Sequence, residues 1–117
     1  APAVIDKYAY QYFDLAKGEK IPFMEKVVMV RKEKRNIIPA VVHKDFTARV
    51  QTVENQTNKI FYNLIKEFYK KTGVPILLNT SFNLNGEPIV CSPTDAIRTF
   101  YSCGLDILVM DNFIVYK

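Results

Sequence analysis

The clearest pattern of apolar residues lies in the middle of the chain. From Ile60 to Tyr69, apolar and aromatic residues recur as adjacent pairs at helical spacing, which gathers them on one side of an α-helix. We expect this helix to run from about Asn58 to Lys71 and to end at Gly73. Its aromatic residues fall at core positions, so we expect them to pack inside the protein.

Strands are predicted on both sides of this helix. Residues 47–53 alternate between small or apolar side chains on one face and mostly polar ones on the other, so Arg49 and Gln51 project together. The apolar run from Ile76 to Leu78 predicts a short strand that is covered on both faces. Four hydrogen-bonding side chains follow this strand: Asn79, Thr80, Ser81 and Asn83.

The N-terminal part of the chain has weaker patterns. Apolar residues at helical spacing predict an amphipathic helix over about residues 4–17. Residues 27–30 predict a short strand, and we expect residues 37–39 to be extended, because a proline disfavours helix in the residue before it. The charged run at residues 31–35 is predicted to be a solvated loop.

The C-terminal part has well-marked turn and helix signals. An Asn-Gly pair at residues 85–86 predicts a tight turn. Ser92 as the N-cap, with proline at the next position and an acidic residue in the first turn, predicts a helix to about Ser102. Two apolar segments around residues 111–112 predict a terminal hairpin. We therefore predict an α+β or α/β fold, with a mixed twisted sheet of about five strands and about three helices, in a single domain over residues 1–117.

Composition narrows the class of protein. With 49% hydrophobic and 24% charged residues, the balance is that of a globular domain. No apolar run is long enough to span a membrane, and the N-terminus lacks the layout of a signal peptide. Cys91 and Cys103 are too few and too widely spaced for a metal knuckle or a redox pair, so we expect reduced thiols and a cytoplasmic location. The net charge of +4 fits a polyanionic partner without identifying one.

Few residues are suited to chemistry. His43 is the only histidine, and no cluster of acidic or thiol residues accompanies it at ligand spacing, so we predict no metal site. Glycine-rich phosphate loops and a nucleophile elbow are absent from the sequence. What remains is Arg49 with Gln51, together with the polar cluster at residues 79–83. Such a set suits a phosphate, because arginine is a forked, permanently charged donor. The alternatives are that the cluster only satisfies a turn and that Arg49 is an exposed strand residue.

Several segments carry a resemblance to a known family. They are Ile38–His43, Thr47–Val53, Thr72–Pro75, Asn79–Asn83, Gly86–Val90, Asp95–Ala96 and Leu105–Asp106. In this order, they resemble the C-terminal domain of nodulation- and antibiotic-type O-carbamoyltransferases, and they cover nearly the whole chain.

The resemblance implies a YrdC-like domain that takes carbamoyl phosphate and ATP and forms carbamoyl adenylate. The carbamoyl group would then pass to a hydroxyl bound in a larger N-terminal domain, which is missing here, so the fragment is expected to be inactive alone. Arg49, Asn79 and Ser81 match family positions that line the carbamoyl phosphate and adenylate pocket, so the resemblance implies that they are the catalytic residues. The implied substrate and nucleotide site comprises Arg49, Gln51, Asn79, Thr80, Ser81, Asn83 and His43. Whether Mg²⁺ accompanies ATP, and which hydroxyl compound is the acceptor, stay open.

One departure from the family lies at residues 43–47. The family usually has His-Val-Asp-Gly-Thr, whereas this chain has Phe46 in place of the glycine. Glycine reaches positive φ easily, so we expect the turn to differ and Phe46 to reshape that edge of the pocket.

Two other functions compete with this one. A non-catalytic nucleotide- or RNA-binding α/β module would also suit the positive charge. However, the aromatic residues are not interleaved with the basic ones, which argues against nucleic acid. The chain could also serve mainly as an interdomain packing surface, which an exposed apolar patch would favour.

Overall fold

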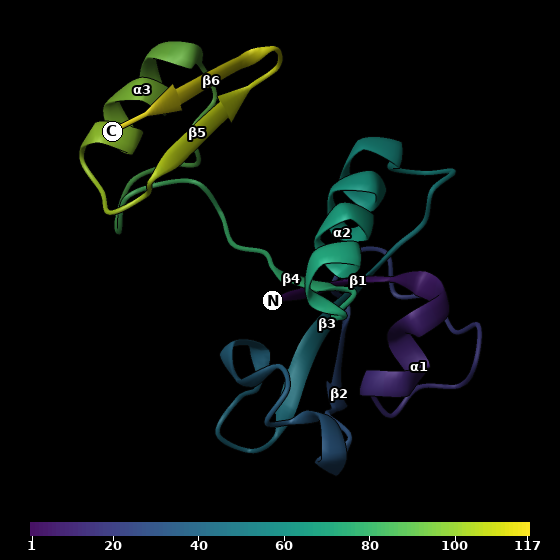
Figure 1. Ribbon diagram of the computed structural model, residues 1–117. Helices are drawn as coiled ribbons and strands as arrows, with labels where there is room; N and C mark the ends of the chain where they lie inside the picture. Colours follow the sequence, from purple (N-terminus) through teal and green to yellow (C-terminus); the bar gives the residue numbers. More distant parts are fainter. The chain divides into compact units, whose positions relative to one another are not determined.

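The computed structural model describes all residues from 1 to 117, and these form two compact units, residues 1–79 and residues 80–117. Figure 1 shows the helices and strands of each unit. The first unit contains a four-stranded sheet, and the second contains one helix and a two-stranded sheet. That the whole chain makes up a single domain stays a prediction.

The four strands of the first unit form a mixed sheet in the order β2-β3-β1-β4. β1 is parallel to β3, whereas β2 is antiparallel to β3 and β4 is antiparallel to β1. The strands are β1 (Pro2–Ile5), β2 (Lys26–Met29), β3 (Thr47–Val53) and β4 (Ile76–Leu78). Together with the three α-helices, this sheet confirms the predicted α+β class, although the chain has six strands rather than about five.

The helix predicted over residues 4–17 is correct only over residues 9–12 and wrong on both sides of them. Residues 2–5 form β1, a 3₁₀ turn follows at Asp6–Tyr8, and the α-helix α1 covers only Ala9–Tyr12. All four residues of β1 are buried, because this strand lies between β3 and β4. A strand with neighbours on both edges and cover on both faces suits the β-branched Val4 and Ile5, and this packing outweighs their helical spacing.

Helix α2 (Lys59–Thr72) confirms the strongest prediction. The side chain of Asn58 caps its start by accepting from the backbone of Phe61 at 3.1 Å, and Gly73 ends it at φ +74°. Ile65 is fully buried against one face of the sheet. The expectation that its aromatic residues pack inside the protein fails at Phe68, which is 38% exposed, whereas Phe61 and Tyr62 pack partly buried against the core. Ile60 and Leu64 are also exposed, at 86% and 58%.

The opposite face of the sheet carries the larger core of the first unit. There Val4, Val50 and Ile76 pack with Phe13 and with the segment that precedes β3. The prediction that this segment is extended at residues 37–39 is wrong. A turn leads there into a 3₁₀ helix at Pro39–Val41. Proline begins such a turn readily at its first position, where its missing N–H is not needed. The basic run is likewise ordered in part, as a 3₁₀ helix at Lys32–Lys34.

β4 differs from the prediction that it would be covered on both faces. Ile76 is buried, but Leu78 is 57% exposed. β4 lies at the edge of the sheet and pairs only with β1. Its exposed end therefore leads directly into the polar residues that follow.

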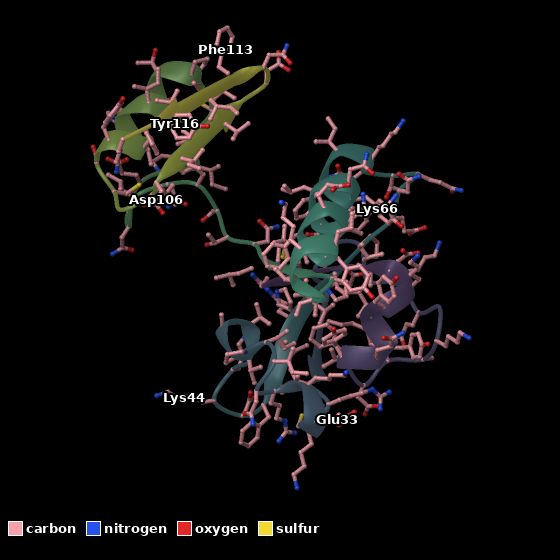
Figure 2. The ribbon with its side chains drawn as sticks, viewed as in Figure 1. Glu33, Lys44, Lys66, Asp106, Phe113 and Tyr116 are labelled. Atoms are coloured by element: carbon pink, nitrogen blue, oxygen red, sulfur yellow. The ribbon has the colours of Figure 1, made fainter.

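The second unit follows the sequence prediction closely. α3 (Pro93–Tyr101) starts at Ser92, whose hydroxyl accepts from the backbone of Asp95, and β5 (Ile107–Met110) pairs with β6 (Phe113–Tyr116) as an antiparallel hairpin. Phe100 and Leu108 form its small core. Phe113 and Tyr116 lie exposed on the hairpin (Figure 2). Both cysteines are free thiols, and no helix of the chain has the length and apolar character needed to cross a bilayer.

Candidate functional site

The register of the sheet places Arg49 and Asn79 at the same end of the sheet, where β3 begins and β4 has just ended. We call this end of the sheet the edge. Gln51 lies opposite Ala3, and Leu78 lies opposite Pro2, so Arg49 and Asn79 both fall at the level of Ala1. The backbone of Ala1 pairs with Asn79 in both directions, at 2.8 and 2.9 Å. Because β4 is antiparallel to β1, its end meets the beginning of β3 at this edge.

The side chains of Gln51 and Asn79 are in direct contact. Asn79 Nδ2 donates to Gln51 Oε1 at 3.4 Å, and Gln51 Nε2 donates to the carbonyl of Pro22 at 3.1 Å. These polar residues come from strands that are not direct neighbours, because β1 lies between β3 and β4. Ala3 lies on β1 directly opposite Gln51, whereas Asn79 pairs with Ala1, so the two amides meet diagonally across β1.

Arg49 is the free cation of this edge. Its side chain is exposed, and no carboxylate of the first unit lies within ion-pair distance of it. The register of β3 places Arg49 at the level of Ala1, beside the backbone pair that Ala1 forms with Asn79. An uncompensated guanidinium beside amide groups can bind a phosphate by forked hydrogen bonds.

His43 lies in the turn that leads into β3. Thr47 donates its hydroxyl proton to Asp45 Oδ1 at 2.7 Å, and its backbone N–H donates to the same oxygen at 3.1 Å. These bonds lower the pKa of Asp45. Since a hydroxyl has only one proton, Thr47 Oγ1 accepts from His43 Nδ1, at 3.0 Å. His43 is thus held by Thr47, which shares a face of β3 with Arg49.

Phe46 keeps the backbone conformation that a glycine would provide. Its φ is +66°, which costs a residue with a side chain about 1–2 kcal/mol. Its N–H donates to His43 and its carbonyl accepts from Val30, both at 2.9 Å. The guanidinium of Arg35 lies 4.1 Å from the centroid of the Phe46 ring. The turn therefore has a left-handed residue at the position where the family has glycine. That the turn differs from that of the family stays a prediction.

The rest of the predicted cluster belongs to the second unit. Thr80 and Ser81 are exposed. Asn83 donates through Nδ2 to the carbonyls of Leu84 and Glu87, at 2.9 and 3.2 Å. Its amide thus closes the turn around Gly86, which is the structural alternative for this residue. The assignment of all these residues to a ligand site stays a prediction.

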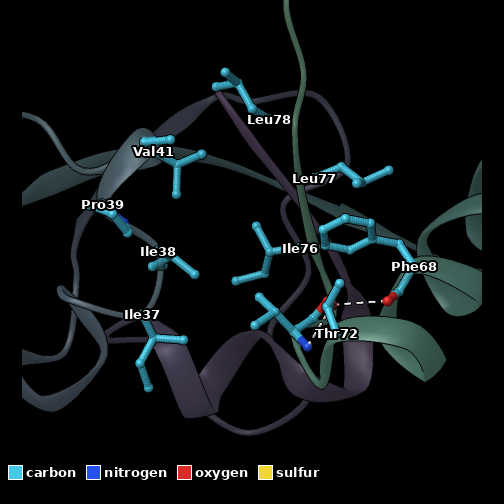
Figure 3. A pocket seen from close by; sticks show the side chains of 11 residues that line it. Ile37, Ile38, Pro39, Val41, Phe68, Thr72, Ile76, Leu77 and Leu78 are labelled. Atoms are coloured by element: carbon cyan, nitrogen blue, oxygen red, sulfur yellow. Dashed lines mark hydrogen bonds between the residues drawn. The ribbon is translucent and has the colours of Figure 1, made fainter.

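Two cavities of the first unit border this region. One, of about 290 Å³, is apolar and is lined by residues 37–41 and by residues of α2 and β4, among them Phe68 and Ile76 (Figure 3). The other, of about 310 Å³, lies between Gln51, Phe23 and Asn58. Sequence reasoning missed the segment at Pro22, because its role rests on a backbone carbonyl, which leaves no mark in side-chain patterns. No group of three or more His, Cys, Asp or Glu residues that could hold a metal ion is present.

Comparison with known proteins adds a family to this geometry. The family model described as "Carbamoyltransferase C-terminus" matches residues 1–117. The chain is 48% identical over 118 residues to nodulation protein NolNO of Sinorhizobium fredii and to nodulation protein NolO of Bradyrhizobium diazoefficiens, which covers all of this chain and 17% and 22% of those proteins. It is 38% identical over 71 residues to a 3'-hydroxymethylcephem-O-carbamoyltransferase of Amycolatopsis lactamdurans, covering 61% of this chain and 14% of that enzyme. The chain spans about a fifth of the length of the first two relatives.

Proposed function

Because this chain belongs to the family of carbamoyltransferase C-terminal domains, we propose that it binds carbamoyl phosphate and ATP within an O-carbamoyltransferase and promotes formation of carbamoyl adenylate. The observation that carries the proposal is the free guanidinium of Arg49, held at one sheet edge with the amide of Asn79. The resemblance to an enzyme named as an O-carbamoyltransferase supports the same class of reaction.

The reaction needs a cation at each step. Water first releases phosphate from carbamoyl phosphate and leaves carbamate. A carbamate oxygen then bonds to the α-phosphorus of ATP, while the bond to the β-phosphate oxygen breaks and pyrophosphate leaves. Phosphoryl chemistry of this kind depends mainly on positioning and on stabilisation of negative charge. We assign that work to Arg49, with Asn79 and Ser81 as its catalytic partners and with Gln51, Thr80, Asn83 and His43 around the ligands.

The final transfer requires a second site. The acceptor hydroxyl attacks the carbamoyl carbon, its proton passes to a base or to solvent, the bond to AMP breaks, and AMP leaves. We place the acceptor in another domain of a longer polypeptide, since the relatives extend far beyond the matched region. The exposed apolar residues of α2 support a packing partner for the first unit. Any Mg²⁺ would be held chiefly by the phosphates of ATP.

Replacement of Arg49 tests this proposal. In the full-length protein that carries this chain, Arg49→Ala should lower the rate of pyrophosphate release with carbamoyl phosphate and ATP by about 10²- to 10³-fold, because one charge-stabilising donor is lost. Arg98→Ala is the matched control, since Arg98 is an exposed arginine that pairs with Glu87. Unchanged turnover in Arg49→Ala would remove this residue from the mechanism and defeat the proposal.

A further inference from the structure

The orientation of the Gln51 amide is fixed by its partner at Pro22. A backbone carbonyl can only accept a hydrogen bond, so the group of Gln51 that contacts Pro22 must be its NH₂. The Gln51 oxygen therefore points the other way, towards Asn79. The backbone at Pro22 thus determines which end of the glutamine faces the edge that carries Arg49.

The orientation of the Asn79 amide is determined in the same way by Gln51. Because the Gln51 oxygen can only accept, the group of Asn79 that contacts it must be the NH₂. The backbone N–H and carbonyl of Asn79 are both occupied by Ala1. Asn79 Oδ1 is left as the acceptor that this residue can offer to a ligand. We call the series from the Pro22 carbonyl through Gln51 to Asn79 the amide chain.

We propose that the amide chain selects the carbamoyl group: Asn79 Oδ1 accepts a hydrogen bond from the carbamoyl NH₂, and Gln51 is the positioning residue that aims it. The inference rests on the proposed function, in which Arg49 binds the phosphate of the same ligand. Arg49 and Asn79 stand at one level of the sheet with β1 between their strands. The edge thus offers a cation for an anionic group and, beside it, an acceptor for a neutral donor.

Carbamoyl phosphate and acetyl phosphate differ in the feature that this arrangement would detect. They share the acyl phosphate, and an NH₂ in one replaces a CH₃ in the other. A methyl group in the same place would leave Asn79 Oδ1 without a partner, and a site built to bind a donor discriminates against a ligand that lacks it. If Gln51 no longer held the Asn79 amide, the asparagine could turn its NH₂ towards the ligand, and this preference would fall.

The experiment measures binding of carbamoyl phosphate and of acetyl phosphate to the full-length protein by calorimetry. We expect the wild type to prefer carbamoyl phosphate and Gln51→Met to lower the ratio of the two affinities by about tenfold, as for one hydrogen bond. Gln11→Met is the matched control, because Gln11 is an exposed glutamine far from the edge in sequence. A purely structural role for Gln51 would weaken both ligands equally and leave the ratio unchanged, which would overturn the inference.

Two further variants keep the outcomes apart. Should Gln51→Met melt at a much lower temperature, Gln51→Asn retains an amide but is too short to reach both partners, and the same fall in the ratio is expected. Arg49→Ala should weaken the binding of both carbamoyl phosphate and acetyl phosphate. If it weakens neither, the proposed function fails; if it weakens both while the Gln51 variants leave the ratio unchanged, only the selection by the amide chain fails.

Discussion

The face of the sheet that packs against α2 has two ends with opposite chemistry. At one end, Ile5 of β1 and Val53 of β3 are buried with Ile65 of the helix. Towards the other end, β3 presents an exposed Arg49 and a half-buried Gln51. Gln51 and Val53 are only two residues apart on one strand. All of these side chains lie on one face of the sheet. Whether a residue there belongs to the core or to the candidate site therefore depends on whether α2 covers it.

The two ends also use their residues differently. The covered end contributes dry packing, whose loss is felt as stability. The open end contributes a free charge and an amide chain, whose loss should be felt in ligand binding with little change in folding. Variants that affect one property and leave the other unchanged would therefore sharpen the comparison.

The largest expected effect on stability is at the covered end. Ile65→Ala should lower the free energy of unfolding by about 2–5 kcal/mol, because it removes a fully buried side chain. Leu64→Ala, on the exposed side of the same helix turn, should change it by no more than about 0.5 kcal/mol. Urea denaturation of both variants is the measurement. Equal losses would mean that α2 does not pack on the sheet through Ile65.

A smaller effect is expected in the turn that leads into the open end. Phe46→Gly and Phe46→Ala both remove the ring that lies over Arg35, but only alanine keeps a side chain at φ +66°. The glycine variant should therefore be the more stable of the two by roughly 1 kcal/mol. Thermal melting of the pair provides the comparison.

Lys44 is the control for this pair. It lies in the same turn, is exposed, and has no positive φ (Figure 2). There the order should reverse, with Lys44→Ala more stable than Lys44→Gly, because glycine increases the entropy of the unfolded chain. The same order at both positions would contradict a left-handed conformation at Phe46.

The smallest effect is a dependence on pH. The hydroxyl of Thr47 and then its backbone N–H lower the pKa of Asp45 below the unfolded value of 3.8. A carboxyl with a lowered pKa contributes stability above its unfolded pKa and loses it as the pH falls through its folded pKa. Melting temperatures followed from neutral pH downwards should thus decline less for Asp45→Asn than for the wild type below about pH 4. Asp14→Asn, outside this turn, is the control. An equal change in the pH dependence of the melting temperature in both variants would contradict its assignment to Asp45.

Much of the fold could be predicted from local patterns. The helix at residues 59–72, the strand at residues 47–53 and the hairpin at residues 107–116 all follow from periodicity and capping. The N-terminal strand could not be predicted in this way, because its four residues gain their stability from neighbours that come much later in the chain.

The candidate site divides along the same line. The sequence alone determined that Arg49 and Gln51 share a face of one strand, since side chains alternate along any strand, and that polar residues follow β4. Only the tertiary structure decided that β1 enters between β3 and β4, that the amides of Gln51 and Asn79 meet across it, and that the Pro22 carbonyl orients them. The physical reason is that strand order, register and backbone acceptors depend on contacts between distant segments, which alternation within a segment does not encode.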